Sequence, residues 1–115
     1  MTAADAIRTF IEGQLSGWRI QFGVWQDGSK TDRYAVIKPT GGLPASLVRR
    51  PAFSLFFIGA AGEDASVAYE AANTVIEAMR QSSGDLVFME PSEPAFNQTN
   101  DGRSVYEVAV TTITN

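Results

Sequence analysis

The spacing of apolar residues divides the chain into segments of helical and extended character. Near the N-terminus, apolar side chains recur every three or four positions, at Ile7, Phe10, Ile11 and Leu15. This spacing predicts an amphipathic helix of about four turns that ends near Ser16 and Gly17. A second helical period begins after Asp64 and lasts to Arg80, with apolar positions at Ala68, Ala71, Ala72, Val75, Ile76 and Met79. The small alanines would let this helix lie close to a sheet.

Elsewhere apolar residues recur at every second position, which is typical of strands with one apolar and one polar face. Residues 18–25 alternate in this way, and residues 33–38 follow the turn signal Asp27-Gly28, so we expect these two strands to form an antiparallel hairpin. Residues 53–58 are almost continuously apolar, which favours a central strand buried on both faces. We expect two further strands, at residues 86–89 and 103–113, separated by a polar loop at residues 90–102.

These elements follow the order α-β-β-β-α-β-β. A hairpin before the second helix and another after it predict a mostly antiparallel or mixed five-stranded sheet with two helices packed on one face. A chain of 115 residues has the usual size of one domain. The sequence therefore predicts a single α+β domain over residues 1–115.

Charge is distributed unevenly along the chain. Residues 1–62 carry seven basic and four acidic side chains, a net charge of +3, whereas residues 63–115 carry two basic and nine acidic ones, a net charge of −7. The total of −4 argues against specific nucleic-acid binding, which depends on clustered Lys and Arg. Complementary patches on one subunit instead favour head-to-tail contacts between copies, and such contacts can close into rings.

The chain offers little catalytic chemistry. It has no Cys and no His, so it lacks a thiol nucleophile, a thiolate metal site and the commonest general base. Acidic Glu63-Asp64 precede a helix, where capping explains them better than catalysis. Glu90, Glu93 and Asp101 fit a solvated loop better than a cation site, and an enzyme could use only these acids and Tyr106. We expect no cofactor, no bound metal and no enzymatic activity.

Two further features concern location and phosphate binding. No apolar run approaches the length of a membrane span and no signal peptide is recognisable, so we expect synthesis in a cytoplasm and no membrane contact. The glycine pairs at Gly41-Gly42 and within residues 59–62 match no phosphate-binding motif, and turn formation explains them better.

Some residues are candidates for contacts between subunits. Trp18 and Trp25 point to opposite faces of one expected strand, so one of them should meet a helix, a ligand or another subunit. Arg49-Arg50 follow Gly41-Gly42 on an expected irregular loop, residues 39–51. Either the two arginines are exposed to solvent and keep a sheet edge from aggregating, or they form a contact arm that reaches an acidic patch. The acids that it would meet on a neighbour include Glu63 and Glu93.

The whole-chain pattern resembles small tail-terminator, or minor tail, proteins of long-tailed phages. The resemblance rests on the N-terminal helix, the region around Asp27-Gly28, the arginine-bearing loop 41–50, the strand at residues 51–58, the alanine-rich helix 64–80 and the closing strands. It implies a subunit made in the host cytoplasm, often from a prophage, that is a monomer in solution and a hexameric ring on the virion tail. The ring would stop the polymerisation of the tail-tube protein and offer a surface to a head-completion protein.

Two other functions remain open at this point. Another head–tail joining or baseplate subunit would share the same size and the same lack of chemistry. A small bacterial binding module, unrelated to phages, would act as a monomer or dimer through the face of its sheet.

Overall fold

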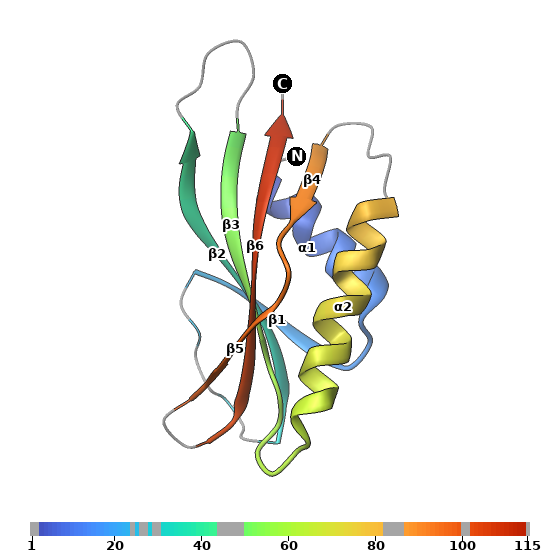
Figure 1. Cartoon of the computed structure of the whole chain (residues 1–115), viewed down its shortest axis with the longest axis vertical. Helices are drawn as coiled ribbons and strands as arrows, with labels where there is room; N and C mark the ends of the chain where they lie inside the picture. Colours follow the sequence, from blue (N-terminus) through green and yellow to red (C-terminus); the bar gives the residue numbers. More distant parts are fainter. Residues whose placement is uncertain are drawn as a thin grey trace.

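The computed structural model describes residues 3–23, 25, 28, 31–43, 50–81, 87–99 and 102–114. Two helices pack beside a long, twisted sheet (Figure 1). The elements are α1 (Ala3–Gln14), β1 (Trp18–Phe22), β2 (Arg33–Leu43), β3 (Arg50–Ile58), α2 (Ala65–Gln81), β4 (Val87–Pro91), β5 (Ala95–Gln98) and β6 (Ser104–Thr114). The α+β class and the predicted order of helices and strands are confirmed, with one additional strand, β5.

The sheet is mixed and has six strands in the described part of the chain. Its order is β1-β2-β3-β6-β4. Strand β5 also pairs with β6, along the same edge as β4 but at the other end of that edge. All neighbours are antiparallel except β1 and β2, which are parallel. The fifth and sixth strands of the chain, β5 and β6, form a hairpin where the sequence predicted only a polar loop before the last strand.

The expected hairpin between β1 and β2 is wrong, because these strands run in the same direction with Trp18 opposite Arg33. Parallel neighbours need a connection that returns along the sheet, and ten residues lie between Phe22 and Arg33. Gly23 leaves β1 with a φ of 90°, a conformation that glycine adopts without strain. The chain then reaches the sheet face opposite the helices, where Trp25 packs.

Both helices cover one face of the sheet, as predicted; we call it the helix face. Ile7 and Ile11 of α1 are fully buried there, together with the apolar side of α2. The sheet contributes Ala35, Ile37, Phe53, Leu55, Phe57, Val108 and Val110 to the same core. Asp64 accepts a hydrogen bond from the Ser66 N–H and so caps α2 as expected.

Strand β3 lies in the middle of the sheet, between β2 and β6, which confirms the interpretation of its apolar run. Phe53, Leu55 and Phe57 face the helices, whereas Phe56 and Ile58 belong to a smaller cluster on the opposite face. We call this second face the outer face. Its buried members are Tyr34, Val36, Ile58 and Val105.

Strands β2 and β3 are longer than the sequence indicated. The pairing continues to Gly41 opposite Ala52, Gly42 opposite Pro51 and Leu43 opposite Arg50, with an irregularity between Pro39 and Gly41. Gly41 and Gly42 therefore lie on a strand and not on the expected irregular loop. Glycine fits such an irregularity because it tolerates distorted strand geometry.

Candidate assembly surfaces

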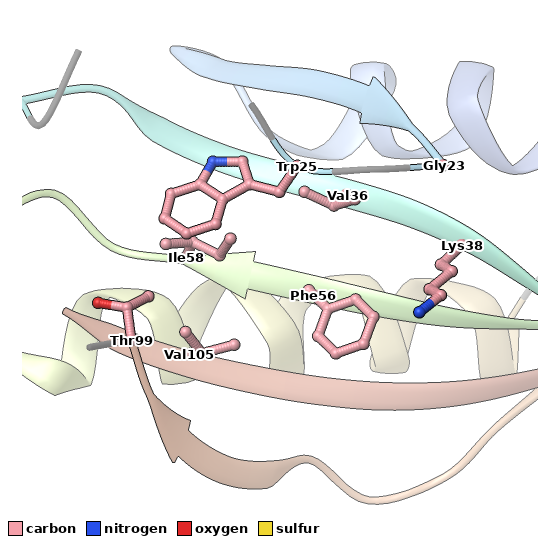
Figure 2. Close-up of a pocket in the computed structure, with 8 residues that line it drawn as sticks. All are labelled: Gly23, Trp25, Val36, Lys38, Phe56, Ile58, Thr99 and Val105. Carbon is pink, nitrogen blue, oxygen red and sulfur yellow. The ribbon is translucent and has the colours of Figure 1, made fainter. Parts of the chain in front are cut away.

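The described residues form a hollow on the outer face (Figure 2). Its volume is about 280 Å³. The floor is formed by β2, β3 and β6, with Trp25 at one side and Thr99 at the other. The lining residues are Gly23, Trp25, Val36, Lys38, Phe56, Ile58, Thr99 and Val105. Most of this lining is apolar, so the hollow is suited to packing rather than to acid–base chemistry.

Arg103 anchors one end of the outer face. Its side chain is 2% exposed and donates hydrogen bonds to the carbonyl oxygens of Gly59, at 2.9 Å, and Asp32, at 2.8 Å. The guanidinium carbon lies 5.2 Å from the ring centre of Trp25 and 5.6 Å from that of Tyr34. Arg103 thus joins the end of β3, the start of β6 and the connection between β1 and β2 through hydrogen bonds and cation–π contacts.

Trp25 lies on the outer face and Trp18 on the helix face, but not as residues of one strand as predicted, because β1 ends at Phe22 and Trp25 belongs to the connection that follows it. Trp18 packs edge-on against Phe57, with ring centres 6.2 Å apart. Trp25 packs edge-on against Tyr34, at 5.9 Å. Figure 2 shows its ring beside Ile58 at one end of the hollow. Trp25 therefore has contacts within its own chain, and part of its surface remains available.

Glu63 forms a two-pronged ion pair with Arg33. Arg33 Nε donates to both carboxylate oxygens at 3.1 Å and Nη2 donates to Oε2 at 2.6 Å. The hydrogen bonds from Arg33 hold the pKa of Glu63 below its ordinary value against the opposing effect of burial, and a bond from the Ala60 N–H helps. The same hydrogen bonds raise the pKa of Arg33. Glu63 thus ties the turn before α2 to the start of β2.

Glu93 occupies a more exposed position beside α2. It accepts a hydrogen bond from Arg80 at 3.1 Å, and its side chain is 74% exposed. Ion pairs of this kind contribute little to stability, so Glu93 can change partners at small cost. The two acids named as interface candidates therefore differ: Glu63 is held by a bidentate partner, and Glu93 is loosely paired.

The paired ends of β2 and β3 lie at one end of the sheet, beside the end of β6 (Figure 1), and we call these paired ends the arm. Gly41 and Gly42 lie on this arm, and the backbone of Arg50 begins its returning strand. Arg49 lies outside the described residues. The structure does not bring this arm close to Glu63, which lies near Ile58 at the opposite end of β3.

Sequence reasoning missed the two most specific polar contacts of the fold. Arg103 follows an expected polar loop, and nothing in the sequence indicated that it would be buried. For Arg33 the sequence indicated only that it begins a strand, and not that it would form an ion pair. The charge pattern contained no signal for either role. A weak indication for Arg103 is the Asp101-Gly102 turn signal directly before it in the sequence, which marks residue 103 as the first residue of the closing strand.

The described residues contain no cluster of three or more acidic side chains able to hold a metal ion. Within the same part of the chain, no helix is long and apolar enough to span a membrane. What the residues do provide is apolar surface on the outer face, charged side chains beside it and strand edges. These features are suited to contacts with other protein subunits.

Comparison with known families gives this surface a context. A family described as phage tail termination protein matches residues 1–115, the whole chain. No match was found among curated proteins. The family confirms the resemblance drawn from the sequence, and it gives the protein a structural role in the phage virion tail, in association with other tail proteins. The chain belongs to the phage tail termination protein family.

Proposed function

We propose that six copies of this protein form a ring on the end of a phage tail tube. The ring stops addition of further tube subunits and presents the surface to which the head-completion protein binds. The observation that carries the proposal is the family match over residues 1–115. The protein would act by contact alone, without catalysis or cofactor.

The placement of charge in the fold supports a ring. Residues of the basic first half build β1, β2 and β3, and residues of the acidic second half build α2, β4, β5 and β6. In the sheet order β1-β2-β3-β6-β4, the strands of the first half of the chain lie next to one another at one edge. The strands of the second half lie at the other edge. Two sides of opposite charge favour head-to-tail contacts between copies. Such contacts close into a ring when the rotation from one copy to the next is a whole-number fraction of a full turn.

The arm formed by β2 and β3 is the proposed contact with a neighbouring subunit or with the tube. Arg49 and Arg50 would supply its positive charge, and Gly41 and Gly42 would let it bend onto a partner. Replacing both arginines by Glu should abolish binding to tube ends while leaving the thermal unfolding midpoint unchanged. Equal binding by this variant would remove the arm from the interface.

Electron microscopy of tail tubes mixed with the purified protein tests the proposal. We expect additional density with cyclic symmetry at one end of each tube, together with failure of those ends to take up more tube protein. Density at the head side of a preformed connector, with bare tube ends, would instead assign the protein to another joining step. A protein that binds neither would contradict the proposed function.

A further inference from the structure

Among the described strands, β1 and β5 form two edges of the sheet that lie at the same level on opposite sides of it. The register of the described strands aligns Arg19 of β1 with Tyr34, Ile58, Val105 and finally Asn97 of β5. The next row runs from Ile20 to Phe96 in the same way. Within the described chain β1 pairs only with β2, and β5 pairs only with β6. Each edge therefore presents a row of backbone groups that another strand can pair with.

Each of these edges also carries an exposed aromatic side chain. Phe22 of β1 is 55% exposed and Phe96 of β5 is 53% exposed. Phe96 packs on Tyr106, which also contacts Tyr69 of α2, with both ring-centre distances at 5.2 Å. Among the described residues, the large hydrophobic side chains that are most exposed are these two phenylalanines and Tyr69. Exposed apolar area thus gathers at the two edges.

We propose that β1 of one copy pairs with β5 of the next copy, so that the sheets join edge to edge around the ring. This inference rests on the proposed ring and names the interface within it. The partner of each edge is a second copy of this chain. Phe96 with Tyr69 would pack against Ile20 and Phe22 across the junction, on the helix face of both sheets.

Strand direction agrees with cyclic symmetry. Strand β1 is parallel to β2, and each step through β3 and β6 to β5 reverses direction, so β1 and β5 run in opposite directions (Figure 2). In a ring whose axis follows the strands, every copy keeps the same sense along that axis. Strand β5 of one copy therefore meets β1 of the next in antiparallel orientation and at the same level, which is the more stable form of pairing.

The β1 edge carries a basic side chain, and an acidic side chain lies one strand inside the β5 edge. Arg19 on β1 is 68% exposed at its side chain and makes a salt bridge with Asp32. Glu107 lies opposite Ala95 on the strand next to β5, where it accepts a hydrogen bond from Ser54. Arg19 and Glu107 both face the outer side of the sheet. An edge-to-edge contact brings the basic edge of one copy to the acidic side of the next, whereas contacts between two like edges do not.

Disulfide cross-linking provides a direct test, because the natural chain contains no Cys. Arg19→Cys combined with Asn97→Cys places one thiol on each edge at the same level. The two sites are four strand spacings apart within one copy, about 19 Å, too far for an internal disulfide. Arg19→Cys with Ala95→Cys covers a register shifted by two residues. Arg19→Cys with Thr74→Cys, an exposed position on α2, is the matched control.

The variants are added to tail tubes, oxidised, and separated under denaturing, non-reducing conditions, while tube capping is scored on the same samples by microscopy. We expect one edge pair to give a ladder ending at a single closed oligomer, with at least about tenfold more cross-linked product than the control, because the interface raises the effective thiol concentration. Dimers from either single-cysteine variant would indicate like-edge pairing and overturn the inference. Capped tubes without a ladder from either edge pair would overturn the interface but keep the proposed function. Uncapped tubes without a ladder would contradict both.

Discussion

The two faces of the sheet differ in how much of their surface this chain covers, and two consecutive residues show the difference. Phe57 faces the helices and is fully buried, in edge-on contact with Trp18. Phe56 faces the other way and is only partly buried, at the floor of an open hollow. The helix face is completed by α1 and α2. In the described part of the chain, the outer face is covered only in part, by Trp25 and the residues that Arg103 contacts.

This difference separates stability from assembly. Burial of apolar area is the main source of folding free energy, so the helix face should supply most of it. The outer face and the strand edges keep apolar and charged groups within reach of other molecules. A subunit that must fold alone and then join a larger structure needs both kinds of surface.

The sharpest test of the contrast is Phe57→Ala against Phe56→Ala. Removing the buried ring should lower the free energy of unfolding by about 4 kcal/mol, because it leaves a cavity as well as losing burial. The same change at Phe56 should cost about 1–2 kcal/mol, since water can enter the hollow. Urea unfolding measures both values. Equal losses would mean that the two faces contribute alike.

Arg103→Met tests the anchor of the outer face. Methionine fills much of the same space but cannot donate to the carbonyl oxygens of Gly59 and Asp32, so we expect a loss of about 3 kcal/mol in unfolding free energy. The tryptophan emission should also shift, because Trp25 loses its cation–π partner. Arg103→Lys is the control that keeps the charge, and it should recover part of the loss. A variant as stable as the natural protein would show that the outer face does not depend on this anchor.

Glu63→Gln should have a smaller and pH-dependent effect. Because the pKa of Glu63 is lowered in the folded state, its stabilising contribution is present above its ordinary pKa of 4.5 and is lost as the pH falls through the folded value. At pH 7 we expect a loss of about 1 kcal/mol, a value reduced for solvent screening at the partly exposed Arg33. The difference from the natural protein should shrink in denaturation curves recorded at decreasing pH below 4.5. A difference that stays constant with pH would rule out the ion pair as its cause.

Glu93→Gln is the matched case for an exposed ion pair and should have the smallest effect. Its partner Arg80 is itself partly exposed, so the free energy of unfolding should change by less than about 0.5 kcal/mol. Thermal unfolding of the two Gln variants side by side measures this contrast. A loss at Glu93 as large as that at Glu63 would contradict the assignment of one tight and one loose pair.

Local patterns predicted much of this fold because local spacing reports burial directly. The helix at residues 65–81 is apolar at the positions that its covered face requires, and the continuous apolar run of β3 corresponds to a strand buried on both sides. In these regions the physical cause lies within one element and is visible in its sequence.

Long-range pairing could not be predicted in the same way. The Asp27-Gly28 signal permits a turn in either a hairpin or a returning connection, and the contacts of Trp25 with Tyr34 and Arg103 are made only in the folded chain. Strand β5 has four exposed residues and no apolar alternation, so its pairing with β6 defines it as a strand. Trp18 and Trp25 were expected on opposite faces and lie there, whereas the edge phenylalanines Phe22 and Phe96 went unnoticed because half-exposed aromatics look like core residues in a sequence.

The length of tail tubes grown in the presence of the protein tests the central claim most directly. Tube protein is allowed to polymerise, the terminator subunit is added partway, and tube lengths are measured at intervals by electron microscopy. The proposed function predicts that growth stops on addition and that the lengths stay fixed, at a ratio of one ring per tube. Tubes that continue to lengthen at the original rate, with the protein absent from their ends, would contradict it.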